Sequence, residues 1–251
     1  MPDLTVEPLA LGSLTAPGTM FEQDGGDEPL TIPVPGWLIR HRAGTALFDC
    51  GMHTDLTAPT PTRDIVELFF DLGIDDDAMI GAQLAAHDVD AADIDIVVLS
   101  HLHFDHVGGL AQLPNARVVV QAEEWRAGFD DDLAAANSFT AEFYDLGHDV
   151  VTVDGEHDLF GDGRVRCIPT PGHTPGHQSM TIGLDSGELV LCGDCAYFER
   201  TLDGSALPGI GHDHSQQAES IARLTALRER GARLVPGHDP DVFAALPALL
   251  A

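Results

Sequence analysis

Apolar positions recur along the chain with two spacings, and each spacing predicts one kind of element. Residues 62–73 follow the spacing of an amphipathic helix, with Thr62 as N-cap and Gly73 as C-cap. Residues 78–87 predict a second, shorter helix, and Ser215–Arg230 predict a third that ends before Gly231 and serves only packing. The apolar positions of the first and third helices are Ile65, Val66, Leu68, Phe69 and Leu72, and Ala218, Ile221, Leu224 and Leu227.

Short apolar runs elsewhere predict β-strands. Residues 37–41 and 45–49 lie on either side of Arg42, Ala43 and Gly44, which predicts a β-hairpin. Four further runs each end shortly before a His or Asp: 94–99 before His101, 165–168 before His173, 188–192 before Asp194, and 233–235 before His238. If these strands lie side by side, the loops that follow them meet at one edge, where rigid scaffolds commonly carry functional residues.

Length and composition fit one α/β domain over residues 1–251, because 44% hydrophobic residues can bury a full core. The sequence shows no basic region followed by an apolar stretch at its start, and no apolar run near the roughly 18 residues of a membrane span. The four cysteines are too scattered for a disulfide framework, and we interpret Cys192 and Cys195 as buried small residues. These features predict a cytoplasmic protein.

The charge balance narrows the range of partners. The chain has 41 acidic residues against 12 basic ones, all arginine, for a formal net charge of −29. Such an excess repels phosphate backbones and anionic membrane surfaces, so we expect neither nucleic acid nor membrane as a partner. Residues 75–77 and 130–132, two Asp runs, are interpreted as hydrated surface in preference to calcium sites. The excess also fits adaptation to high salt, where screening relieves self-repulsion.

The segment from His101 to His106, His-Leu-His-Phe-Asp-His, is the strongest chemical signal. In an extended segment His101 and His103 point the same way and can bind one ion, while a turn after Phe104 directs Asp105 and His106 toward a second. A hydrated His-rich loop is the alternative in a chain with 13 histidines. The metal interpretation is favoured because three later loops carry further ligand-type residues, His173, Asp194 and His238.

Together these motifs resemble the metallo-β-lactamase superfamily, which is marked by H-x-H-x-D-H, a later P-G-H-T, a strand-ending Asp and a final Gly-His. The resemblance spans nearly the whole chain and implies a four-layer αββα sandwich with two divalent metal ions, zinc foremost, although iron, cobalt and manganese also suit such ligands. It implies that His177 supports the site and is not itself a ligand. The implied ligands are His101, His103 and His173 for one ion, Asp105, His106 and His238 for the other, and Asp194 between them.

Within that superfamily the chain is most similar to the N-acyl homoserine lactonases. Residues 100–109 and 170–179 carry the resemblance, as does Asp194 followed three residues later by Tyr197. It implies a quorum-quenching hydrolase of a small-molecule substrate, in which hydroxide supplied by the metals opens a lactone ring. Tyr197 then stabilises the oxyanion together with the first ion, and Asp105 passes a proton to the leaving alkoxide. A buried packing role for Tyr197 stays open.

Other functions on the same scaffold are also possible. Only 13 residues follow His238, which leaves no room for the helical C-terminal domain of glyoxalase II thioesterases. Asp194 departs from β-lactam-cleaving members, which usually lack a bridging carboxylate. A different lactone, ester or thioester remains the main alternative, and a non-catalytic metal-binding module is the distant one. The seven suitable ligand positions argue against that module.

Apolar side chains near the metal motifs predict a substrate pocket. Met20 and Phe21 are candidates for contact with an acyl chain. We interpret His212 and His214 as part of a hydrated loop. An aromatic group between the first two metal loops predicts either a helical lid or ordinary packing. Its members are Trp125, Phe129, Phe139, Phe143 and Tyr144.

Overall fold

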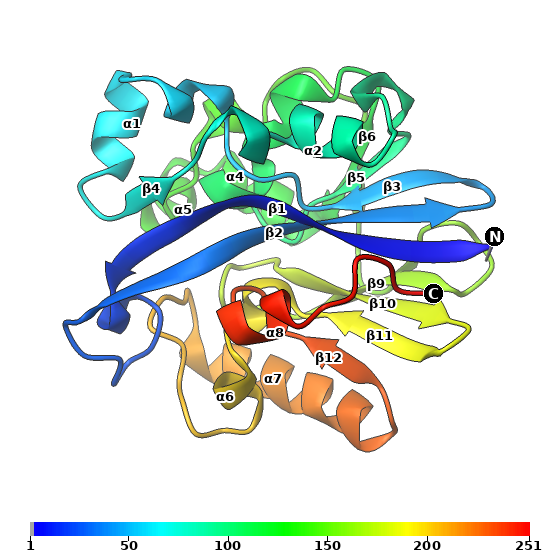
Figure 1. Ribbon diagram of the computed structural model, residues 1–251. Coiled ribbons are helices and arrows are strands. Elements are labelled where there is room, and N and C mark those ends of the chain that lie inside the picture. The colour runs from blue at the N-terminus through cyan, green and yellow to red at the C-terminus, as the bar shows by residue number, and fades with distance from the viewer. Residues whose placement is uncertain (1–2) are drawn as a thin grey trace.

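Two β-sheets stack on one another in the computed structural model, which describes residues 3–251, and helices cover both outer faces (Figure 1). This arrangement confirms the expected four-layer αββα sandwich. Between the sheets lies an apolar core that includes Trp37, Val98, Met180 and Ile182. Two further apolar clusters join each sheet to its own helices. None of the helices between residues 3 and 251 is long and apolar enough to cross a membrane.

The first sheet has seven strands in the order β4-β1-β2-β3-β5-β6-β7. Its strands are β1 Leu4–Pro17, β2 Pro29–His41, β3 Gly44–Phe48, β4 Asp71–Gly73, β5 Ile96–Val98, β6 Arg117–Gln121 and β7 Val150–Val153. The β2–β3 pair confirms the predicted hairpin, although β2 extends well beyond it. From β3 to β7 the strands run parallel. Their apolar runs are typical of parallel strands covered on both faces.

The second sheet has five strands in the order β12-β11-β10-β9-β8. Its strands are β8 His157–Asp158, β9 Val165–Pro169, β10 Gln178–Leu184, β11 Gly187–Leu191 and β12 Arg233–Val235. Each of the four strands predicted before a His or Asp exists, with slightly different ends. β5 belongs to the first sheet and the other three to the second, so the predicted loops meet across the two layers.

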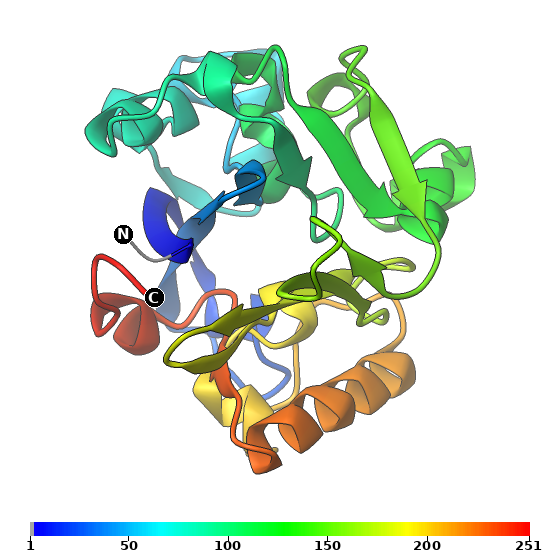
Figure 2. The ribbon, with the colours of Figure 1, turned by 90° about the vertical axis from the view of Figure 1, so that its right-hand side faces the viewer.

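Helices pack on the outer side of each sheet. Their bounds are α1 Pro61–Val66, α2 Ile80–Ala86, α3 Phe104–Val107, α4 Ala122–Gly128, α5 Asp131–Ala136, α6 Glu199–Leu202, α7 His214–Glu229 and α8 Pro240–Ala244. Figure 2 shows α7 running along the outer side of the second sheet. α2 and α7 confirm the second and third predicted helices. In α7, however, Ala218 is exposed, while Gln217, Ser220 and Leu224 are buried.

The prediction of one helix over residues 62–73 was wrong. α1 stops at Val66, and its N-cap is Thr60, whose hydroxyl accepts a hydrogen bond from the Arg63 amide at 3.2 Å. Asp71–Gly73 instead form strand β4 and pair with β1. Pairing with a distant strand therefore overrides the helical spacing. The predicted apolar face is also largely uncovered, because Ile65, Leu68 and Phe69 are exposed.

Candidate metal centre

Seven His and Asp side chains from four loops meet in two adjoining groups. In each group the potential ligand atoms lie within 4.8 Å of one another. All of the side chains except the half-buried His103 are buried. The first group is His101, His103, His173 and Asp194, and the second is Asp105, His106 and His238. The structure thus brings together every residue that the motifs singled out as a ligand.

The loop after β5 divides its residues between the two groups. His103 precedes the single helical turn of α3, which carries Asp105 and His106 away from His101 and His103. Leu102, between the two histidines, is fully buried in the core and fixes the segment. Beyond α3 the backbone packs so closely that a Cβ on Gly108 would lie 2.1 Å from the amide nitrogen of His53. Only glycine fits at that position.

Backbone carbonyls set the orientation of three imidazole rings. His103 donates through Nε2 to the Asn137 carbonyl at 2.9 Å, and His238 donates through Nδ1 to the Pro33 carbonyl at 2.7 Å. His173 faces the Ile210 carbonyl through Nδ1 at 3.4 Å. A carbonyl only accepts, so the other nitrogen of each ring carries a lone pair whenever the ring is neutral. Each of these lone pairs faces its group, as metal-ligating histidines require.

Ring nitrogens of the first group meet at short distances. Nδ1 of His103 lies 2.8 Å from Nε2 of His101 and 3.1 Å from Nε2 of His173. In the second group, Nε2 of His106 is buried without a hydrogen-bond partner. Converging lone pairs and an unsatisfied buried nitrogen both destabilise the site unless a cation lies among them. The donor set therefore fits a pair of divalent metal ions.

Asp194 lies between the two groups with one oxygen toward each. Its Oδ1 is 3.0 Å from Nε2 of His238 and 3.3 Å from Nε2 of His106. Its Oδ2 is 3.4 Å from Nε2 of His173. Although burial alone would raise the pKa of Asp194, the charges of His238 and His106 hold it well below its usual range. The carboxylate is therefore ionised and faces both groups.

The two groups differ in the protonation of their histidines. Burial lowers the pKa of His101, His103 and His173, so these rings are neutral and offer lone pairs. Burial also opposes a charge on His106 and His238, but attraction to Asp194 and Asp105 raises the pKa of both. Before metal binds, the second group therefore holds protons that an ion must displace.

Asp49 is a functional residue that the sequence reasoning missed. Its Oδ2 accepts from Nδ1 of His106 at 2.8 Å and from the Ser100 hydroxyl at 2.7 Å. Its backbone adopts a left-handed conformation, with φ of 59°, directly after β3. An Asp that follows an apolar strand and precedes Cys-Gly is the sequence signal that indicates such a turn. Asp49 fixes the ring of His106 as a carboxylate behind a ligand does.

Glu124 was also missed, and it connects the loops of the first group. Its fully buried carboxylate accepts from the Leu102 amide at 3.0 Å and from the Gly176 amide at 2.8 Å. Burial raises its pKa to about 7. Glu124 sits in α4, far in sequence from both loops, and its sequence context resembles that of a surface helix. No local signal distinguishes it from the exposed Glu123 beside it.

His177 lies behind Asp194 and outside both groups. Its Nε2 accepts from the backbone amide of Asp194 at 3.0 Å, and its Nδ1 lies 2.9 Å from the Thr170 hydroxyl. Both ring nitrogens are therefore used by protein partners. This is the supporting position expected for His177.

A cavity of about 520 Å³ opens over the two groups. Tyr197 lines it beside Asp105, Asp194 and His238, and its ring meets His238 with centroids 5.2 Å apart. Burial, with the charges of Asp194 and Asp105, raises the pKa of Tyr197 well above its usual range, so its hydroxyl keeps its proton. The apolar wall is formed by Leu14, Met20, Phe21, Ile32, Ile65, Val66, Phe69, Phe70, Phe104 and Phe139.

Most of the other candidates from the sequence lie outside this cavity. Of the predicted aromatic group only Phe139 lines it, while Trp125, Phe129 and Tyr144 pack against one another. The side chains of His212 and His214 are exposed, as expected for a hydrated loop. All four cysteines are buried and free.

Comparison with known proteins gives the family. The family model of the metallo-β-lactamase superfamily matches residues 32–238. The chain is 33% identical to the N-acyl homoserine lactonase AttM of Azorhizobium caulinodans, over 97% of this chain and 96% of that protein. It is 34% identical to AttM of Agrobacterium fabrum, over 90% of this chain and 88% of that protein.

Solved structures show the same fold. An N-acyl homoserine lactone hydrolase, solved with N-hexanoyl-L-homoserine bound at its catalytic metal centre, matches with a TM-score of 0.85 at 23% identity, over 98% of each chain. AidC, a dizinc quorum-quenching lactonase, matches with a TM-score of 0.72 at 19% identity, over 99% of this chain and 90% of that one. The chain therefore belongs to the metallo-β-lactamase superfamily, as a metal-dependent hydrolase related to the AttM lactonases.

Proposed function

We propose that this protein opens the lactone ring of N-acyl homoserine lactones and so acts as a quorum-quenching lactonase. The observation that carries the proposal is the position of Tyr197, whose ring lies in the wall of an apolar cavity directly beside the two ligand groups. The names of the AttM relatives support the same substrate class. A lactone with an acyl chain has a polar reacting end and an apolar tail, which matches the two parts of this cavity.

The ligand groups provide two ion sites of different character. His101, His103 and His173 would hold one ion with neutral imidazoles, and Asp105, His106 and His238 would hold the other. Asp194 would contact both ions, because each of its oxygens faces one group. Two divalent ions held there, zinc foremost, would lower the pKa of bound water enough to supply hydroxide near neutral pH.

Tyr197 supplies a hydrogen-bond donor for the oxyanion that forms when the lactone carbonyl is attacked. Its hydroxyl is protonated because burial keeps its pKa high. Its ring is held between Phe21, at a centroid distance of 6.2 Å, and His173, at 5.7 Å, so little reorganisation is needed during the reaction. A fixed donor of this kind stabilises the transition state more than the ground state.

Asp105 is the carboxylate assigned to proton transfer. Burial alone would raise the pKa of Asp105, but the charge of His106 holds it below its usual value, so Asp105 is ionised. It lines the same cavity as Tyr197. An ionised carboxylate in this position can accept a proton from the attacking water and pass it to the alkoxide that leaves when the ring opens.

The wall of the cavity suits an acyl chain. Met20 and Phe21, the predicted contacts of an acyl chain, line it, and so does Phe139, whose ring centroid lies 5.6 Å from that of His103. Ile65 and Phe69 line its rim and are 61% and 58% exposed. An acyl chain that covers them gains about 0.8 kcal/mol for each buried methylene. Longer chains should therefore be preferred until the cavity is filled.

The decisive experiment is Tyr197→Phe with Tyr144→Phe as its matched control, because the chain contains only 2 tyrosines. Tyr144 is also buried, but its hydroxyl donates to the Gly128 carbonyl, away from the ligand groups. We expect Tyr197→Phe to lower kcat about ten- to a thousandfold at unchanged metal content. Tyr144→Phe should lower the melting temperature and leave kcat unchanged.

The assay is a hydrolysis panel of acyl homoserine lactones, a simple lactone, a thioester and a β-lactam on metal-quantified protein. Fully metallated Tyr197→Phe with wild-type kcat and KM would remove Tyr197 from the reaction. Faster turnover of the thioester or the β-lactam than of every lactone would replace the proposed substrate class.

A further inference from the structure

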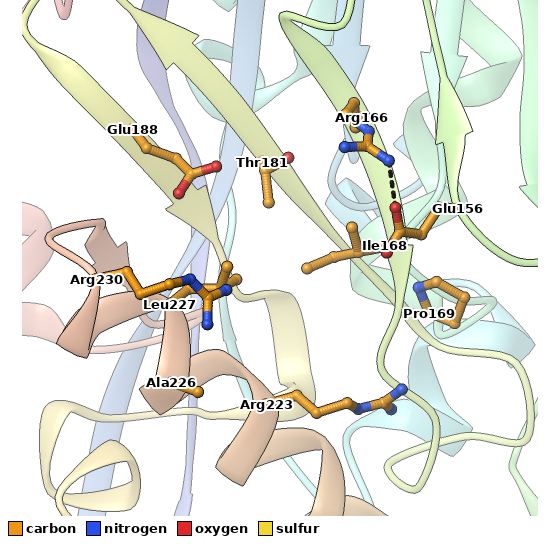
Figure 3. A pocket seen from close by; sticks show the side chains of 10 residues that line it. All are labelled: Glu156, Arg166, Ile168, Pro169, Thr181, Glu188, Arg223, Ala226, Leu227 and Arg230. Atoms are coloured by element: carbon orange, nitrogen blue, oxygen red, sulfur yellow. Dashed lines mark hydrogen bonds and ion pairs between the residues drawn. The ribbon is translucent and has the colours of Figure 1, made fainter.

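A second cavity of about 500 Å³ lies on the outer face of the second sheet, between that sheet and α7 (Figure 3). Its floor is the outer face of β9 and β10, where Ile168 and Thr181 point away from the core between the sheets. Val165, Cys167, Met180 and Ile182 alternate with the outward residues and fill that core. Nothing in the hydrolytic reaction uses this cavity.

The wall formed by α7 combines apolar and cationic side chains. Ala226 and Leu227 face the floor, and Arg223 and Arg230 lie on either side of them (Figure 3). Arg230 is the C-cap of α7 and follows Arg223 by seven positions, or two helical turns, so the two residues lie on the same side of the helix about 10 Å apart. The cavity therefore has an apolar middle with a guanidinium at each end.

These two arginines are exceptional in this chain. Nine of the 12 arginines form an ion pair with a carboxylate. Between residues 3 and 251, the three that form none are Arg223, Arg230 and Arg233, and the first two line this cavity. With 41 acidic residues available, an arginine without a carboxylate partner is unexpected.

The local charge differs in sign from that of the whole molecule. The third arginine in the cavity, Arg166, is paired with Glu156, and the remaining charged residue is Glu188. Three arginines against two glutamates leave an excess of positive charge, in a chain whose formal net charge is −29. A guanidinium binds carboxylates with two parallel hydrogen bonds, and its charge is always present.

We propose that this cavity is a binding site for a small organic carboxylate with an apolar body. The carboxylate pairs with Arg223 or Arg230, and the apolar body lies between Ile168 and Leu227. Both parts of the ligand are required, because the arginines alone are open to water and the apolar surface alone is small. The site does not depend on the lactonase proposal, and either can fail without the other.

Arg223 also contacts the support of the metal centre, which affects the choice of variants. It donates to the Ser220 hydroxyl at 3.0 Å, and Ser220 donates to the Pro171 carbonyl at 2.7 Å, in the loop of His173. A change at Arg223 can therefore disturb the metal loop. Arg230 makes no such contact among the described residues, so Arg230→Gln is tested alone and together with Arg223→Gln.

The experiment is calorimetric titration of the metal-loaded protein with hexanoate at low salt, with 1-hexanol and inorganic phosphate as comparison probes. We expect hexanoate to bind more tightly than either comparison probe. Affinity should fall about tenfold in Arg230→Gln if Arg230 pairs with the carboxylate, and in the double variant whichever arginine does so, since a charge-assisted contact is lost. Arg228→Gln, on the same helix but paired with Glu199, is the control and should bind as the wild type does.

Two results would overturn the proposal. One is hexanoate binding that is undetectable, or that survives unchanged in the double variant and so occurs outside this cavity. The other is equal or tighter binding of phosphate, which would show that the apolar floor contributes nothing. Circular dichroism melts of each variant establish that any loss of binding occurs in folded protein.

Discussion

Replacement of Glu124 by Gln tests whether one buried carboxylate holds the first ligand group together. Glu124 accepts from the Leu102 amide at 3.0 Å, in the loop of His101 and His103, and from the Gly176 amide at 2.8 Å, in the loop of His173. Gln has nearly the same shape but only one acceptor oxygen. One of the two amides in Glu124→Gln therefore faces an NH₂ group and loses its partner.

The size of the effect follows from these contacts. A buried amide left without a partner costs about 1–3 kcal/mol of folding stability. Because the amides position ligand loops, affinity for the first ion should also fall about tenfold or more, as it does when groups behind a ligand are removed. We therefore expect Glu124→Gln to lower the melting temperature and to lose one ion to a chelator sooner than the wild type.

The raised pKa of Glu124 gives this prediction a pH dependence. Burial raises the pKa to about 7 in the folded protein, above its value in the unfolded chain. The stability associated with this group is therefore fully present at acidic pH and is lost as pH rises through about 7. Glu124→Gln lacks this titration. In metal-free protein its stability deficit should shrink by about 1 kcal/mol between pH 6 and pH 8.

The assay is urea unfolding of metal-free protein at both pH values, with chelator competition on the loaded protein. Glu123→Gln is the matched control, because Glu123 precedes Glu124 in the same helix but forms an exposed pair with Arg126. An exposed pair contributes about 0–1 kcal/mol, so the control should stay near the wild type. If Glu124→Gln retains wild-type stability and metal affinity, the carboxylate does not hold the loops and the reasoning fails.

Three further predictions concern the metal centre and the charge of the chain. Asp194→Ala should sharply weaken binding of both ions, because each carboxylate oxygen faces one ligand group. Elemental analysis measures the metal content, and unchanged occupancy in the variant would contradict the dinuclear site. Acidification should release the ion of the second group before that of the first, because His106 and His238 have a raised pKa while His101 and His173 have a lowered one. Metal content after dialysis across a pH series checks this, and simultaneous loss of both ions would refute it. Added chloride should raise the melting temperature at constant pH until the effect saturates, because it screens repulsion within a chain of formal net charge −29. A melting temperature that falls steadily with salt would show that repulsion does not control stability.

The spacing of residues along the chain was sufficient to predict the structure where neighbouring residues alone determine the backbone geometry. The alternation of His101 and His103, followed by a turn at Phe104, predicted two groups, and α3 provides that turn. The strands that follow short apolar runs and the bounds of the 16-residue helix α7 were also predicted closely, because both depend on residues near one another in the sequence. The assignment of these residues as metal ligands stays a prediction for elemental analysis to test.

The spacing of apolar residues gave a wrong prediction where a strand distant in the sequence determined the local structure. Residues 62–73 have helical periodicity, yet Leu72 pairs with Leu14 in a strand, and Leu68 remains 77% exposed. An apolar spacing states which side chains share a face, but not whether anything covers that face. For the same reason α7 was predicted to serve packing alone, whereas its Gln217 donates to the Asp194 carbonyl at 3.1 Å.

The sequence by itself determined the chemistry of the seven His and Asp side chains, and the resemblance carried by its motifs predicted their division between two ions and the layered αββα architecture. Only the tertiary structure decided which residues stand behind the ligands and which surfaces form cavities. Asp49 meets His106, and Glu124 meets the Gly176 amide, across more than fifty residues of chain in each case. Such contacts depend on how the two sheets and their loops converge, and a carboxylate has the same local sequence context whether it is hydrated like Glu123 or buried like Glu124.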